Sequence, residues 1–212
     1  MNYNERKDEF IALLKGKLNE DRFIHSMGVA DTAVRLAEKF GGDKDKAYIA
    51  GLLHDVMKNE TAEEQLKIMK KDGIILSQAE KNNPKLWHAM SGAAFIKLVL
   101  GITDPDIVNA VRYHTTGRAG MSLLEKIIYT ADFISPERNY PDVDVMRSLS
   151  FESLDKGDLY SLQFSLRKLS ENQLVIHTDS VDFYNELVIK LKDAENEKNE
   201  PNEEKSIQSR KD

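Results

Sequence analysis

The sequence predicts an all-α protein, and three observations lead to this fold class. Apolar residues recur every three or four positions through most of the chain, as at Phe23, Met27, Ala30 and Val34. Runs in which polar and apolar residues alternate, which would indicate half-buried strands, are hard to find. No strand followed by a glycine-rich loop and a helix is recognisable, which excludes P-loop and dinucleotide-binding folds. We therefore expect one bundle of about ten helices.

Signals that start and stop helices divide the chain into these elements. Thr61, Ser77 and Ser122 are each followed three positions later by a glutamate, which is the pattern of a capping box. Glycines end helices because they adopt left-handed conformations, and prolines fit the first helical turn. The expected helices cover residues 4–18, 21–40, 43–58, 84–100, 105–114, 122–134, 142–150, 156–171 and 180–195, with two short helices starting near residues 61 and 77.

The chain is expected to form one helical domain of residues 1–192, although a division near residues 73–83 is an alternative. Residues 193–212 contain almost no large apolar side chains and are dense in glutamate, lysine and asparagine. Such a segment cannot offset its ordering entropy by burial. We therefore predict a disordered, charged C-terminal tail over residues 193–212.

Composition excludes several classes of protein. The 212 residues carry a formal charge of −6, which argues against a protein that coats duplex nucleic acid. The absence of cysteine excludes disulfides, thiolate nucleophiles and zinc fingers. No apolar run approaches the roughly 20 residues of a membrane span, and the amino terminus has no apolar signal core. A cytoplasmic protein without membrane contact is therefore expected.

Histidines and aspartates lie inside otherwise apolar predicted helices. Taken singly, each is more often a hydrogen-bonded core residue or a helix cap than a ligand. Taken together, imidazoles and carboxylates without thiolates suit iron, manganese, cobalt or zinc, and helical bundles host such inward-facing sets. The candidate metal ligands are His25, His54, Asp55, His88, His114 and Asp132.

The order of His25, then His54-Asp55, then Asp132 resembles the H…HD…D signature of the HD-domain metal-dependent phosphohydrolases. The stretches 22–29, 86–89, 112–118 and 131–138 are similar to those of the YqeK-type bacterial HD proteins. That group consists of symmetrical bis(5′-nucleosyl)-tetraphosphatases, which split diadenosine tetraphosphate into two ADP. The resemblance covers roughly residues 5–190 and implies an HD-domain helical bundle.

The resemblance also implies how the site is built. His25, His54, Asp55 and Asp132 would hold one metal, while His88 and His114 would complete a second position that Asp55 can bridge. Iron is the metal that the family suggests, with manganese or cobalt as substitutes and one or two ions bound. Such metals neutralise phosphoryl oxygens and generate hydroxide near neutral pH, so no protein nucleophile is needed. Relatives also suggest a homodimer.

Roles follow for the residues around the metals. Asp55, His88, His114 and Lys58 are expected to act in catalysis; Lys58 is included because it lies one helical turn after Asp55. The resemblance places Arg22, Thr115 and Arg138 in contact with the nucleotide. Arg118, in a glycine-rich stretch, is a further candidate for phosphate contact. The substrate-contacting set is Arg22, His25, Asp55, His88, His114, Thr115, Asp132 and Arg138.

Three other functions remain open at this point. The ligand quartet determines the chemistry better than the substrate, so another HD-domain nucleotide phosphohydrolase or nucleotidase is the nearest alternative. Pairs of iron ions held by histidine and aspartate can also activate oxygen, which a diiron oxygenase would use. A nucleotide-binding sensor would keep the ligands without turning substrate over.

Overall fold

The structure is a computed structural model that describes residues 4–199, and it confirms the all-α fold class. Within that range it contains eleven α-helices, two short 3-10 helices and no strand. The 3-10 helices are η1 (Asn4–Arg6) and η2 (Pro84–Leu86). The α-helices are α1 (Lys7–Lys17), α2 (Glu20–Phe40), α3 (Lys44–Leu53), α4 (Ala62–Lys71), α5 (Gln78–Lys81), α6 (Trp87–Leu98), α7 (Pro105–Tyr113), α8 (Leu123–Ile134), α9 (Val143–Glu152), α10 (Leu154–Glu171) and α11 (Thr178–Asn199).

Three predicted helix starts are confirmed by their capping contacts. Ser77 and Ser122 each form the full reciprocal capping box at α5 and α8. At α4 the Thr61 hydroxyl accepts a hydrogen bond from the backbone N–H of Glu64. Helix α2 ends at Gly41, whose φ of 77° is the left-handed conformation expected there.

Two predicted helices are shorter than expected or divided in the structure. The helix expected over residues 43–58 ends at Leu53, because the backbone N–H groups of Val56 and Lys58 turn to the carbonyls three residues earlier. The helix expected over residues 84–100 is divided into η2 and α6. The tight turns after Leu53 place His54 and Asp55 at a helix end instead of inside a helix.

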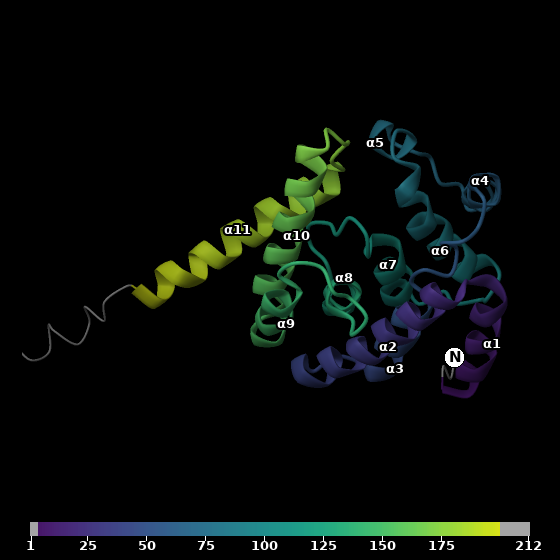
Figure 1. Ribbon diagram of the computed structural model, residues 1–212, viewed down its shortest axis with the longest axis horizontal. Coiled ribbons are helices and arrows are strands. Elements are labelled where there is room, and N and C mark those ends of the chain that lie inside the picture. The colour runs from purple at the N-terminus through teal and green to yellow at the C-terminus, as the bar shows by residue number, and fades with distance from the viewer. Residues whose placement is uncertain (1–3, 200–212) are drawn as a thin grey trace, which may run out of the picture.

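Helix α11 extends further than predicted and continues through Asn199. Residues 193–199, which the sequence assigns to a disordered tail, are therefore helical, and this part of the tail prediction is wrong. In Figure 1, α11 projects away from the other helices at the yellow end of the chain. The rest of the predicted tail, residues 200–212, lies outside the described residues.

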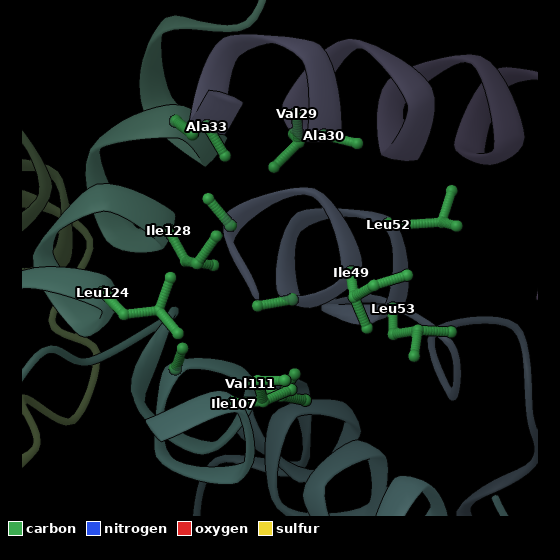
Figure 2. Close-up of a cluster of buried hydrophobic side chains, with 14 of the residues drawn as sticks. Val29, Ala30, Ala33, Ile49, Leu52, Leu53, Ile107, Val111, Leu124 and Ile128 are labelled. Carbon is green, nitrogen blue, oxygen red and sulfur yellow. The ribbon is translucent and has the colours of Figure 1, made fainter. Parts of the chain in front are cut away.

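The main core surrounds α3, which packs against α2, α7 and α8. Figure 2 shows side chains of these four helices meeting. The labelled residues are Val29, Ala30, Ala33, Ile49, Leu52, Leu53, Ile107, Val111, Leu124 and Ile128. The C-terminal end of α3 is thereby fixed deep in the bundle, where His54 and Asp55 follow it.

A second, smaller cluster fixes α10 and α11 against α8. Its buried members include Tyr129 of α8, Leu162 of α10 and Phe183 of α11. The rings of Tyr129 and Phe183 meet edge to face with centroids 5.5 Å apart. Among the described residues, no helix combines the length and apolar character that crossing a bilayer requires.

A buried carboxyl group joins α8 to α10 and gives the fold a pH dependence. Burial raises the pKa of Asp158 to about 8, although the hydroxyl of Thr130 donates a hydrogen bond to it and Lys126 opposes the shift. The folded protein therefore keeps a proton on Asp158 that the unfolded chain releases near its ordinary pKa of 3.8. Between these values the unfolded state binds fewer protons, so the stabilising contribution of Asp158 falls as pH rises.

We expect Asp158→Asn to gain stability relative to the wild type as pH increases from 5 to 8. The amide does not titrate, so the free energy of unfolding of the variant does not fall by the amount, up to about 1.4 kcal/mol per pH unit, that Asp158 causes in the wild type. Thermal unfolding at several pH values measures this, with Asp31→Asn on the exposed face of α2 as the matched control. Parallel stability curves for Asp158→Asn and the wild type would show that Asp158 is ionised in the folded protein.

Candidate metal centre

The structure brings all six candidate ligands together from five helices. His25 lies on α2, His54 and Asp55 follow α3, His88 begins α6, His114 ends α7 and Asp132 lies on α8. Their ligand atoms form three overlapping groups in which every atom lies within 4.8 Å of the others. The groups are His25–His54–Asp55, His54–His114–Asp132 and Asp55–His88–His114.

All four histidines turn the same nitrogen toward this cluster. Each Nδ1 atom lies against an oxygen acceptor, so a neutral ring carries its hydrogen on Nδ1 and its lone pair on Nε2. Burial lowers the pKa of His25, but its hydrogen bonds with Asp132 and Glu137 raise it above the ordinary value. The Nε2 atoms of His25 and His54 are 3.3 Å apart, and those of His88 and His114 are 3.2 Å apart. Burial lowers the pKa of His54 and lowers that of His88 to about 4, which favours the neutral form of both.

Asp55 lies between the two histidine pairs. Its Oδ2 atom is 3.4 Å from Nε2 of His54, and its Oδ1 atom is 3.2 Å from Nε2 of His88 and 3.6 Å from Nε2 of His114. Oδ1 is buried and has no hydrogen-bond partner. A carboxylate oxygen facing imidazole lone pairs needs a positive charge between them, because an unpaired buried charge is costly.

Asp132 completes the cluster from α8. Its Oδ1 atom is 2.9 Å from Nε2 of His25 and 3.9 Å from Nε2 of His54. Burial raises the pKa of Asp132, but the hydrogen bond with His25 and the charge of Arg138 lower it further, to well below its ordinary value. Burial also raises the pKa of Asp55, and the surrounding histidines likewise bring it well below the ordinary value. Both carboxyl groups are therefore ionised at neutral pH.

The donor set fits divalent metal ions. Four imidazole nitrogens and two carboxylate groups converge without sulfur, which is a combination that transition metals such as iron, manganese, cobalt and zinc accept. The partnerless Oδ1 of Asp55 and the converging lone pairs both call for cations. The cluster is therefore a candidate divalent-metal site.

Three cationic side chains lie against this cluster: Arg22 and Arg138, predicted to contact substrate, and Lys58, predicted to act in catalysis. Arg22 donates to Oδ2 of Asp55 at 2.8 Å, and Arg138 forms a short ion pair with Asp132. The Nζ atom of Lys58 is 3.0 Å from Nε2 of His88. These contacts keep positive charge at the edge of the ligand cluster, where an anionic ligand would meet it.

Thr115 also lies where the sequence places it, with its Oγ1 atom 3.3 Å from Nε2 of His88. Arg118 does not reach the site. Its guanidinium group forms two hydrogen bonds with Glu125, at 2.7 and 3.0 Å, on the helix that carries Asp132. Arg118 is therefore held by Glu125, away from the ligand cluster, and its contact with phosphate stays a prediction.

Two cavities open on either side of the cluster, and Lys58 lines both. The first has a volume of about 570 Å³ and is lined by polar side chains that include Arg22, His25 and Arg138. The second has a volume of about 550 Å³ and is more apolar. Besides His88, His114, Thr115 and Asp132, its lining includes Leu86, Phe133, Leu169, Leu174 and Val175. The cluster thus lies between a polar space and a partly apolar one.

Three residues to which the sequence analysis gave no role lie at this site. Glu137 and Ser135, in the loop after α8, both lie against the Nδ1 atom of His25. His177, the one histidine outside the ligand cluster, is 8% exposed and lines the more apolar cavity. The sequence signal for Glu137 was its position five residues after Asp132, in the stretch that carries the family resemblance.

Comparison with known proteins supports a common origin for this cluster. The model of the HD domain family matches residues 22–137. The symmetrical bis(5′-nucleosyl)-tetraphosphatase of Bacillus subtilis (strain 168) is 40% identical over 182 residues, which cover 86% of this chain and 97% of that protein. The protein of the same name from Staphylococcus aureus (strain NCTC 8325 / PS 47) is 33% identical over 189 residues, covering 85% of this chain and 95% of its own.

A solved structure gives the same result for the fold. It is a crystal structure from Clostridium acetobutylicum, described as a predicted HD superfamily hydrolase involved in NAD metabolism. The two structures superpose with a TM-score of 0.84 at 39% sequence identity, and the match covers 86% of this chain and 97% of the other. The similarity therefore extends over nearly the whole of each relative.

Proposed function

Because this chain belongs to the HD-domain family, and within it to the symmetrical bis(5′-nucleosyl)-tetraphosphatases, we propose that it hydrolyses diadenosine tetraphosphate to two ADP. The observation that carries the proposal is the convergence of four Nε2 atoms and two carboxylates in one buried cluster. Curated relatives of this name match the chain over most of its length. A hydrolase needs no protein nucleophile at such a site, which agrees with the absence of cysteine.

The six ligands would hold one or two divalent ions, and we propose iron as the metal, with manganese or cobalt as substitutes. When bound, such ions neutralise phosphoryl oxygens and lower the pKa of water toward neutrality. Asp55 faces both histidine pairs, which supports its assignment as the bridging ligand. Together with His88 and His114, it makes up the proposed catalytic set at the second position.

The substrate is a chain of four phosphates with a nucleoside at each end. Cleavage at its centre requires space for an ADP on both sides of the reacting phosphates. The cavities of about 570 and 550 Å³ on the two sides of the cluster match this requirement. Arg22 and Arg138 would bind phosphates in the polar cavity, and Thr115 would bind them in the other.

Lys58 is the cation shared by both cavities, and we propose that it binds phosphate oxygen near the scissile bond. Its side chain is about one-third exposed and is not among the metal ligand groups. Its ammonium group lies 3.0 Å from His88 and 3.7 Å from Oδ1 of Asp55. It can therefore compensate the negative charge that develops on oxygen during cleavage.

We expect Lys58→Met to lower kcat/KM by about 10- to 100-fold while leaving metal content unchanged. A hydrogen bond to a charged group contributes about 1.5–3 kcal/mol, and each 1.4 kcal/mol corresponds to about tenfold in rate. Lys39→Met, at the exposed end of α2, is the matched control and should retain full activity. Wild-type kcat/KM in Lys58→Met would remove Lys58 from the proposed set.

Product analysis tests the proposed function. The protein is loaded with iron or manganese, incubated with diadenosine tetraphosphate and analysed by chromatography. Formation of ADP as the only nucleotide product is the expected result. Formation of ATP with AMP would show asymmetric cleavage, and oxygen consumption without nucleotide cleavage would indicate an oxygenase; either contradicts the proposal.

A further inference from the structure

The four candidate ligand histidines do not all have the same kind of hydrogen-bond partner at Nδ1. In three of them, Nδ1 donates to the backbone carbonyl three residues earlier in the chain, at 2.7–2.8 Å. These pairs are His54 with Gly51, His88 with Lys85 and His114 with Val111. His25 is the exception, because its Nδ1 atom forms a short hydrogen bond with the carboxylate of Glu137.

The position of each histidine in its helix explains the difference. His54 and His114 are the C-cap residues of α3 and α7. The last backbone carbonyls of a helix have no N–H partner within the helix, so they can accept from a side chain. His88 is the second residue of α6, and its partner carbonyl lies before that helix begins. His25 lies inside α2, where each carbonyl accepts from the N–H four residues later. Its ring therefore needs a partner from outside its own helix.

Glycine at residue 28 leaves room for the Glu137 carboxylate where it contacts His25. Gly28 lies one turn after His25 on the same face of α2. A Cβ atom at this position would be 2.6 Å from Oε2 of Glu137 and 3.3 Å from Cδ of Pro136. Glycine inside a helix costs about 1 kcal/mol relative to alanine, so a glycine here is explained by the clearance it provides.

The loop that carries Glu137 is held in place by contacts independent of His25. Arg147 of α9 donates hydrogen bonds to the carbonyls of Ile134, Ser135 and Arg138, at 2.9–3.1 Å. The hydroxyl of Ser135 donates to the same Glu137 oxygen that faces His25. The Glu137 carboxylate is therefore presented to His25 by a supported loop.

The charge of Glu137 suits this role. A carboxylate accepts from Nδ1 of His25, which leaves Nε2 as the nitrogen that faces Asp132 and the other ligand atoms. A carboxylate behind a ligating imidazole also makes that imidazole a stronger ligand.

We propose that Glu137 is a positioning residue that fixes the His25 ring for metal binding, and that Gly28 is required because it admits Glu137. The inference rests on the proposed metal-dependent function, since His25 is a ligand only if the cluster binds metal. It adds a residue pair on α2 and the loop after α8 to the six ligands. Glu137 also lines the polar cavity, and in this proposal it acts through His25.

Metal binding without nucleotide tests the inference. Manganese affinity is measured by competition with a chelator, and the absorption spectrum of the cobalt-loaded protein reports changes in the ligand set. We expect Glu137→Ala to weaken manganese binding by about 10- to 100-fold and to change the cobalt spectrum. Glu137→Gln retains an acceptor oxygen without the charge, so its affinity should fall between those of Glu137→Ala and the wild type.

Gly28→Ala tests the proposed requirement for glycine at residue 28 without altering any polar side chain. It should weaken manganese binding as Glu137→Ala does, and the double variant should lose little more than either single variant, because both remove the same contact. Gly16→Ala on α1 is the matched control, since a Cβ atom there meets nothing within 4 Å. Circular dichroism establishes that each variant is folded.

Two results would overturn the inference. Glu137→Ala with wild-type manganese affinity and cobalt spectrum would show that His25 needs no carboxylate partner. Gly28→Ala with wild-type affinity would show that the glycine is not required for the contact. Failure of the proposed function would appear separately, as wild-type protein that binds manganese but does not release ADP.

Discussion

Asp55→Asn is expected to lose both metal binding and hydrolysis, with kcat reduced by at least about 1000-fold. Asp55 is the only candidate ligand whose two oxygens face different histidine pairs, His54 on one side and His88 with His114 on the other. Metal charge contributes several kcal/mol to phosphoryl chemistry, and about 1.4 kcal/mol corresponds to a tenfold change in rate. The asparagine amide is the same size as the carboxylate, so the substitution removes the negative charge of Asp55 without leaving a cavity.

Metal content and the initial rate of ADP formation are the measurements for this variant. Asp31→Asn, on the exposed face of α2, is the matched control and should match the wild type in both. Circular dichroism separates loss of ligand from loss of fold. An Asp55→Asn protein that retains metal and hydrolyses substrate at the wild-type rate would refute the assignment of Asp55.

Gly51→Ala is expected to destabilise the fold and weaken the metal centre together. A Cβ atom at Gly51 would be 2.9 Å from Cα and 3.1 Å from the backbone N of Ala30. Backbone atoms cannot rotate away, so α2 and α3 must separate. These helices hold His25 and His54, whose Nε2 atoms are only 3.3 Å apart.

The expected size of the effect follows from two opposing terms. Overpacking of this kind costs about 1–3 kcal/mol, and the better helix propensity of alanine offsets about 1 kcal/mol of it. We therefore expect Tm to fall by a few °C, since about 1 kcal/mol shifts Tm by about 2–4 °C in a domain of this size. Manganese affinity should fall in the same variant.

Gly16→Ala provides the matched comparison for Gly51→Ala. A Cβ atom at Gly16 meets nothing within 4 Å, so the same substitution should raise Tm slightly through helix propensity alone. Differential scanning calorimetry and manganese competition measure both variants. A gain in Tm for Gly51→Ala like that of Gly16→Ala would show that a Cβ atom at residue 51 fits between α2 and α3, contrary to this prediction.

The metal ligands could be predicted from the sequence because they break a strong pattern. Polar residues such as His25, His88 and Asp132 are costly inside apolar helices unless they have partners, so their positions stand out in a single sequence. The resemblance to HD-domain proteins then assigned these residues to one metal site. The fold class followed from the same periodicity, because it is repeated in nearly every segment of the chain.

Other features depend on contacts that periodicity does not contain. Val56 and Met57 continue the apolar spacing of α3, so the sequence predicts a helix where the structure has turns. Glu137 is a carboxylate in a polar loop, and its contact with His25 spans 112 positions of the chain. Gly28 signals this contact only once the loop after α8 is known to pass over it.

Stepwise addition of metal to the metal-free protein tests whether hydrolysis depends on metal bound at the ligand cluster. Manganese or iron is added to the chelator-treated protein while bound metal and ADP formed from diadenosine tetraphosphate are measured in the same sample. We expect no hydrolysis before metal is added, a rate that rises with bound metal, and ADP as the only nucleotide product. Full hydrolysis by protein that holds no metal would contradict this expectation.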